Sequence, residues 1–292
     1  IQSLYNIIDS IFVSQLGEEA LTAVSLIFPL QNLSLAISCG IGIAMNAFIA
    51  RHLGAKDDNK ASYYATQGIV MSLAHSLLFL IIGLFFIRPF LNMFTTNQNV
   101  INYGMQYGMI VVSLVIGQFI HLAIEKMFQA TGNMMMPMIM QIFGAVINII
   151  LDPIFIFGCH MGVRGAALAT IISQACSCIW VLSFLFGTKS TLRIKKQNLT
   201  LKAPVILPCL ALGLSLFIMQ ASESIISVCF NSSLLKYGGD VAVGAMTILT
   251  SVMQFAMLPL QGLGQGAQPI MSYNYGAKNT DRVKGTFFLL LK

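Results

Sequence analysis

The chain has 292 residues, of which 57% are hydrophobic and 9% charged, and its mean hydropathy is +0.80. Soluble domains carry roughly 25% charged residues, so this composition excludes a soluble globular protein. The net charge of +6 comes from basic residues in short segments between apolar ones, which indicates orientation in a membrane rather than nucleic-acid binding. We therefore expect an all-α polytopic membrane protein.

Apolar stretches separated by Gly, Pro, Asn and charged residues predict the membrane spans. We expect eight spans and the start of a ninth, at residues 1–16, 21–50, 62–88, 101–125, 134–158, 163–187, 204–233, 241–273 and from 283 onward. Several of these stretches exceed the length needed to cross a bilayer, so tilted or kinked helices are expected. We also expect the helix to be distorted at Pro153, which has no backbone N–H to donate. Both ends of the sequence fall inside apolar stretches, and we expect the chain to be truncated at both ends.

A short pattern of residues occurs twice in the chain, 222 positions apart. It consists of Gly40-Ile41-Gly42 with Gly54-Ala55-Lys56, and again of Gly262-Leu263-Gly264 with Gly276-Ala277-Lys278. A repeat of this length indicates two similar halves, which in membranes are typical of transporters. Six predicted spans fall within one period, so both halves enter the membrane from the same side and are parallel repeats.

Lys and Arg between the spans predict the orientation. Twelve of them follow even-numbered spans and three follow odd-numbered spans, which places the even-numbered loops and the N-terminus in the cytoplasm. The basic segment 188–203 is then a cytoplasmic linker. It separates an N-lobe of helices 1 to 6, residues 1–187, from a partial C-lobe of helices 7, 8 and the start of 9, residues 204–292.

Three acidic residues lie inside the predicted spans: Asp9, Asp152 and Glu223. A carboxylate there costs at least about 2.5–3.5 kcal/mol, so such residues mark ion or proton paths, the alternative being a structural hydrogen bond between helices. Asn148 lies one turn before Asp152, and Tyr5 lies one turn before Asp9. Such a group suits Na⁺ bound by oxygen atoms or a proton bound by a carboxyl group, and both alternatives stay open.

Glu125, next to Lys126 near a predicted cytoplasmic helix end, is expected to form an interfacial ion pair. The four His residues have no ligand spacing, and Cys176 and Cys178 lack companion ligands for a metal site. Phosphate-loop, zinc-protease and serine-nucleophile motifs are missing from the sequence. We therefore expect no enzyme, no metal site and no cofactor, but a carrier that is driven by an ion gradient.

Five motifs together resemble the multidrug and toxic compound extrusion (MATE) family, most of all its bacterial drug-efflux branch. In chain order they are NIIDSIFV at residues 6–13, QATGN at 129–133, NIILDPIF at 148–155, GVRGAA at 162–167 and PIMSYNYGAK at 269–278. The resemblance runs along the whole chain. It implies a two-lobe bundle of parallel six-helix repeats around a central cavity, which works by alternating access.

The resemblance also implies a site. Prokaryotic relatives bind the coupling cation in the N-lobe with an Asp and a nearby Tyr on helix 1, an Asn and an Asp on helix 5, and a Thr on helix 6. The matching residues here are Asp9, Tyr5, Asn148, Asp152 and Thr170. Glu223 matches a helix-7 Glu that some branches use, which implies a C-lobe ion or drug site.

From these features we expect a cation-coupled antiporter that uses H⁺ or Na⁺ to export amphipathic, cationic drugs by alternating access. The alternative within the same superfamily is a lipid-linked oligosaccharide flippase, which the scarcity of Lys and Arg within the spans disfavours. An intramembrane enzyme and a non-transporting scaffold are the alternatives from other classes. We expect small-molecule drugs and membrane lipids as partners, no nucleic acid, a monomer, and a multi-pass location in the plasma membrane, the inner membrane of a bacterium.

Overall fold

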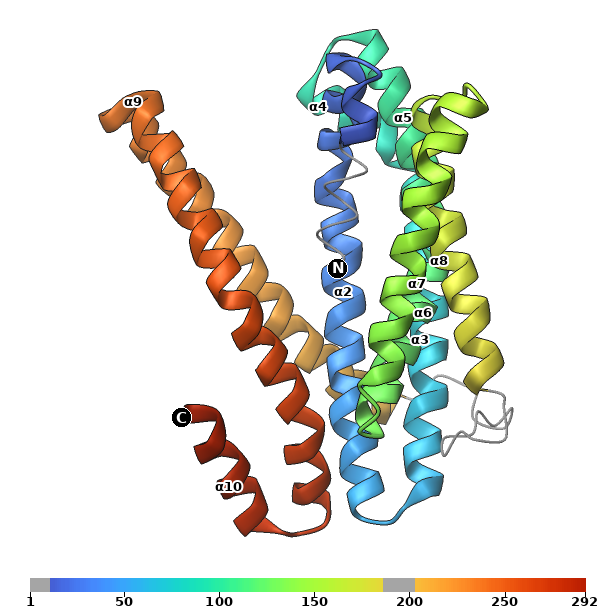
Figure 1. The fold of residues 1–292 in the computed structure, drawn as a ribbon, viewed down its shortest axis with the longest axis vertical. Helices are drawn as coiled ribbons and strands as arrows, with labels where there is room; N and C mark the ends of the chain where they lie inside the picture. The colour runs from blue at the N-terminus through green and yellow to red at the C-terminus, as the bar shows by residue number, and fades with distance from the viewer. Residues whose placement is uncertain (1–10, 186–202) are drawn as a thin grey trace.

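The computed structural model describes residues 11–185 and 203–292, and within these residues it is helical, without strands. Figure 1 shows long helices running along the long axis of the molecule. The elements are α2 (Glu18–Gly54), α3 (Asp58–Phe85), α4 (Ile87–Phe94), α5 (Gln98–Ser113), α6 (Ile116–Ala130), α7 (Met135–Pro153), the π-helical turn η1 (Ile154–Gly158), α8 (Val163–Leu185), α9 (Ala203–Gly276) and α10 (Thr280–Leu291).

Four helices of the described part are long and apolar enough to cross a membrane: α2, α3, α7 continued by η1, and α8. The pair α5 and α6 adds a fifth if its bend of 40° lies within one span. The helical polytopic fold class is thereby confirmed, whereas the number of spans and the two lobes stay predictions. The stretch at 101–125, predicted as one span, is instead two helices that are broken at Leu114 and Val115.

The turn between α2 and α3 and the turn between α9 and α10 have the same local structure, and the repeated residues form them. Lys56 and Lys278 adopt the left-handed backbone conformation, with φ of 57° and 58°. Asp57 and Asn279 then each accept a hydrogen bond from a backbone N–H three residues later, at 3.1 and 3.3 Å. Such caps begin the following helices. Figure 1 shows both turns at the same end of the molecule.

Near these turns, α2 and α9 cross at the repeated glycines. Gly54 leaves room for the backbone carbonyl of Tyr273, and Gly276 leaves room for the backbone carbonyl of Arg51. A side chain at either glycine would overlap these backbone atoms, so this approach requires Gly at both positions. Gly54 and Gly276 are 222 positions apart, as are Arg51 and Tyr273. The contact is therefore reciprocal between the two copies of the repeat.

The helical stretch α9 turns back on itself within its 74 residues. Its Gly213 lies against Gly40 of α2, and Gln268 Nε2 donates a hydrogen bond to the carbonyl of Ile43, also in α2, at 3.3 Å. A straight helix would separate Gly213 from Gln268 by ~80 Å. The stretch must therefore reverse between them, as Figure 1 shows, and its two arms correspond to the seventh and eighth predicted spans.

Apolar side chains form two clusters between the helices, and α2 contributes to both. One cluster joins α2 to α3 and α6 around Met45 and Ile124, and the other joins α2 to α5 and α8 around Ile27 and Tyr107. Outward-facing side chains are also apolar, as in the row of α3 that contains Leu77, Ile81 and Phe85. Helices that are apolar on all sides are typical of a bundle surrounded by lipid.

Candidate functional site

Asn148 and Asp152 lie one turn apart near the end of α7. Their side chains are 1% and 0% exposed, and Asn148 Nδ2 donates a hydrogen bond to Asp152 Oδ1 at 3.4 Å. The π-helical turn η1 follows directly after Pro153. Proline has no backbone N–H to donate, and π-turns are frequent at functional sites. The expected pair and the expected helix distortion are both present, while their role as an ion site stays a prediction.

Thr170 lies on α8, the helix that packs along α7 and η1. Its side chain is buried, and its Oγ1 donates a hydrogen bond to the carbonyl of Ala166 at 3.1 Å. A hydroxyl oxygen that donates its proton keeps its acceptor positions. Thr170 therefore offers an oxygen atom suited to a cation, on a helix that packs against the one carrying Asp152.

The side chains of the remaining residues of the predicted sites are outside the described part of the molecule. Asp9 and Tyr5 fall within residues 1–10. Glu223 falls within α9, but its side chain is not among those described. The assignments of all three stay predictions.

A cavity of about 70 Å³ lies between α6, α7 and α8, next to Asn148. Its polar lining residues are Gln118, His121, Gln141, Asn148, Ser173, Gln174 and Ser177. Four of them carry buried polar atoms that lack a hydrogen-bond partner among the described residues: His121 Nδ1, Asn148 Oδ1, Gln174 Oε1 and Ser177 Oγ. Buried polar atoms are normally satisfied, and a cavity of this size has room for several water molecules. The cavity thus has the space and the partners that water or a small cation requires.

The spacing of the polar residues explains why they meet. On each of three helices the polar residues recur at intervals that keep them on one face. They are Gln118, His121 and Glu125 on α6, Gln141, Asn148 and Asp152 on α7, and Thr170, Ser173, Gln174 and Ser177 on α8. The three helices pack against one another in pairs, so these faces adjoin. We call this set of ten residues the polar seam.

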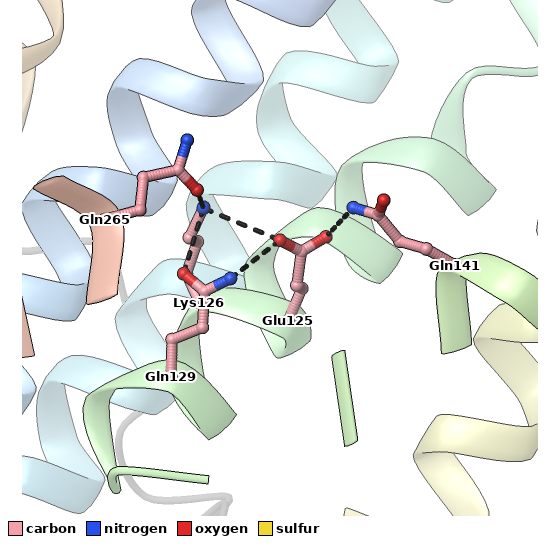
Figure 2. Close-up of polar contacts among 5 residues, drawn as sticks. All are labelled: Glu125, Lys126, Gln129, Gln141 and Gln265. Carbon is pink, nitrogen blue, oxygen red and sulfur yellow. Dashed lines mark hydrogen bonds and ion pairs between the residues drawn. The ribbon is translucent and has the colours of Figure 1, made fainter. Parts of the chain in front are cut away.

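At one end of the polar seam, Glu125 belongs to a buried hydrogen-bonded cluster, which Figure 2 shows. Glu125 Oε1 accepts a hydrogen bond from Gln129 Nε2 at 2.9 Å and lies 3.5 Å from Lys126 Nζ. Glu125 Oε2 accepts a hydrogen bond from Gln141 Nε2 at 2.9 Å. Lys126 Nζ donates to Gln129 Oε1 at 3.0 Å and to Gln265 Oε1 of α9 at 3.3 Å. The two charges balance, and Lys126 links α6 to α9.

The predicted ion pair of Glu125 and Lys126 is present, but it is buried among helices rather than open to solvent. Their exposed fractions are 4% and 5%, because α2, α7 and α9 pack around this part of α6. The burial depends on neighbours that the local sequence does not reveal. One signal was present in the sequence, since Gln141 places an amide group within the apolar stretch 134–158, and buried charges need such partners.

Metal ligands do not gather in the described part of the chain. Within residues 11–185 and 203–292, no group of three or more His, Cys, Asp or Glu side chains is close enough to hold a metal ion. Cys176 and Cys178 are free thiols. The polar groups of the polar seam are oxygen and nitrogen atoms of side chains on three helices.

The fold defines a helical polytopic membrane protein. The chain belongs to the MatE family, whose model matches residues 1–154 and 215–292. It is similar to the multidrug export protein MepA of Staphylococcus haemolyticus, with 28% identity over 289 residues, which are 99% of this chain and 64% of that protein. It is also similar to the probable multidrug resistance protein YoeA of Bacillus subtilis, with 26% identity over 276 residues, which are 92% and 59% of the two chains.

Solved structures show the same arrangement of helices. A multidrug resistance MATE family transporter of the MOP superfamily, in an outward-facing conformation, matches with a TM-score of 0.92 and 26% identity over 99% of this chain and 64% of its own. A MOP superfamily transporter from Pyrococcus furiosus matches with a TM-score of 0.90, 26% identity and the same coverage of 99% and 64%. The chain thus spans a little less than two thirds of the length of these relatives.

Proposed function

We propose that the complete protein is a cation-coupled antiporter, which exports amphipathic, cationic drugs by alternating access. Its family membership and the names of MepA and YoeA support the export of drugs. The buried pair of Asn148 and Asp152 supports the coupling to a cation, and this observation carries the proposal. A carboxylate within a membrane span is costly and usually marks the path of an ion or a proton.

The proposed coupling site combines residues from three helices of the N-lobe: Asp9, Tyr5, Asn148, Asp152 and Thr170. In the proposed cycle, H⁺ or Na⁺ from outside neutralises Asp9 and Asp152, which favours the conformation that releases the drug. Loss of the ion to the cytoplasm resets the protein. Exchange requires that ion and drug favour different conformations, because a ligand shifts an equilibrium only through its different affinities for the two states.

Two contacts support a conformation that is closed toward the cytoplasm. The crossing at Gly54 and Gly276 and the hydrogen bond from Lys126 to Gln265 join α2 and α6 to α9. The crossing lies beside the turns that the excess of Lys and Arg assigns to the cytoplasmic side. Alternating access would separate these contacts, and Glu223 would contribute an ion or drug site in the C-lobe.

The proposed setting is the plasma membrane, in a bacterium the inner membrane, with the N-terminus in the cytoplasm. The membrane-spanning helices and the distribution of Lys and Arg support it. The proposed partners are small-molecule drugs and membrane lipids, and the proposed state is a monomer. This function needs no enzymatic activity and no cofactor besides the coupling ion.

The proposal is tested by ethidium efflux from proteoliposomes that contain the complete protein, with H⁺ and Na⁺ gradients imposed separately. We expect one gradient to drive efflux and Asp152→Asn to abolish it. Asp281→Asn makes the same chemical change at an exposed position and serves as the matched control, with efflux like that of the wild type. Full efflux by Asp152→Asn, or none by a well-folded wild type, would refute the proposal.

A further inference from the structure

The coupling site leaves much of the polar seam without a role. The cavity begins beside Asn148 and reaches Gln141, which donates its hydrogen bond to Glu125. Gln141 and Asn148 are two turns apart on α7, or ~10 Å along the helix axis. The cavity therefore extends from the hydrogen-bond partner of Asp152 to a hydrogen-bond partner of Glu125.

His121 lies between these two regions. It lines the cavity one turn before Glu125 on α6, and its Nδ1 atom is buried without a partner among the described residues. Imidazole both accepts and donates protons near neutral pH. The other polar groups that line the cavity are amides and hydroxyls, which hydrogen-bond water but do not hold a proton at neutral pH. His121 is thus the lining residue that is able to pass a proton along the cavity.

The surroundings of Glu125 exclude a metal cation and admit a proton only when the contact with Lys126 weakens. Its oxygen atoms already accept hydrogen bonds from two amides, and Lys126 Nζ lies 3.5 Å away. A positive charge at that distance repels Na⁺ and also stabilises the ionised carboxylate, so a proton bound by Glu125 must displace the contact with Lys126. Among the described side chains, the titratable groups near Glu125 besides Lys126 are His121 on α6 and the Cys39 thiol on α2. The described side chains that α7 and α9 contribute to the cluster, those of Gln141 and Gln265, are neutral.

We propose that Glu125 is a second proton-binding site of the N-lobe, which receives protons from the Asp152 region through water in the cavity and through His121. The inference rests on the proposed function and extends it by giving the coupling proton a route inward. In the transfer, a cavity water passes the proton to His121, and His121 passes a proton on to Glu125. The Glu125 carboxylate then becomes a carboxylic acid. No other bond changes, and the proton later leaves to the cytoplasm.

Protonation of Glu125 also weakens a contact with α9. While Glu125 is ionised, it attracts the ammonium group of Lys126, and that ammonium donates its hydrogen bond to Gln265. When Glu125 is neutral, the ion pair is lost and Lys126 is held less firmly in this position. The inner site thus connects the arrival of a proton to the release of α9 from α6.

Infrared difference spectra of the complete, reconstituted protein at low and high pH test the proposal directly. Protonation of a buried carboxyl group adds a carboxylic-acid carbonyl band. We expect this band to lose one component in Glu125→Gln and a different one in Asp152→Asn. Glu18→Gln, at an exposed position, is the matched control and should leave the buried-carboxyl components unchanged. An unchanged spectrum in folded Glu125→Gln would overturn the proposal.

A second readout separates this inference from the proposed function. In a stopped-flow pH jump, His121→Gln should slow the appearance of the Glu125 band without removing it, because the relay is lost while the site remains. An unchanged rate in His121→Gln would overturn the route through His121. If wild-type protein shows the Glu125 band but exports no ethidium, the antiporter proposal fails while the proton site stands.

Discussion

Two buried carboxylates of the polar seam differ in how they are held. Asp152 accepts a hydrogen bond from Asn148 at 3.4 Å and is followed by a distorted helix end. Glu125 is bonded to two amides at 2.9 Å and paired with Lys126 in the middle of packed helices. Asp152 thus has a neutral hydrogen-bond partner in Asn148, whereas Glu125 has its own cation in Lys126.

The comparison separates a carboxylate that is proposed to bind the coupling cation from one that is proposed to bind a proton only. The Glu125 carboxylate is paired with Lys126, so it stabilises the packing of α6 and loses its charge only when it binds a proton. We propose that Asp152, whose partner Asn148 lines the cavity, exchanges its cation repeatedly. Variants in the two regions should therefore differ in how much they lower stability and how much they impair coupling.

Lys126→Met should give the largest loss of stability. It leaves Glu125 buried without its counter-charge, and breaking a buried pair in this way costs about 3–5 kcal/mol. The double variant Glu125→Gln with Lys126→Met should recover much of that loss, because neither charge then remains. Thermal and denaturant unfolding of the purified complete protein measure both. Equal stability of the single and double variants would show that the pair is not coupled.

Gly54→Ala should have the next largest effect, because Gly54 lies where α2 crosses α9. The added methyl group would meet the backbone of Tyr273, and such overpacking costs typically about 1–3 kcal/mol. It should also favour the conformation that is open to the cytoplasm. Gly264→Ala is the matched control, because a side chain there meets nothing within 4 Å. Cysteine accessibility at the α2–α3 turn reports the opening.

Asn148→Leu should affect stability less than either change above. It removes the hydrogen bond to Asp152 Oδ1, whose net contribution is about 0.5–1.5 kcal/mol. Coupling should suffer more than folding, because the amide is a proposed ligand of the cation. Unfolding midpoints and the ion dependence of ethidium efflux distinguish the two effects. If Asn148→Leu lowers the unfolding midpoint strongly but leaves the ion dependence of efflux unchanged, Asn148 has a structural role and is not a ligand of the cation.

Asp57, a partly exposed carboxylate, should show the smallest effect and provides a baseline for the two buried ones. The backbone N–H of Lys60, and then its ammonium group, hold the pKa of Asp57 below its usual value. Its contribution to stability is therefore present above the unfolded-state pKa and is lost as the pH falls through the lower folded-state pKa. Asp57→Asn keeps a capping side chain and should remove this slight acid dependence. Unfolding midpoints across the acidic range check it.

The sequence predicted the features that depend on neighbouring residues along one helix. The spacing of Asn148 and Asp152, and the distortion beside Pro153, follow from helix geometry and from the missing proline N–H. The similar turns at Lys56 and Lys278 follow from the repeated residues. The burial of Glu125 and the bend between α5 and α6 depend on packing between helices, which local hydropathy does not encode.

The measurement that tests the central claim most directly is ethidium binding to the purified complete protein, titrated at several H⁺ and Na⁺ concentrations. The account predicts that ethidium binds more weakly as the coupling ion increases, and that Asp152→Asn removes this dependence while ethidium still binds. An ion dependence that is the same in Asp152→Asn as in the wild type would contradict the account, because coupling would then not involve this carboxylate.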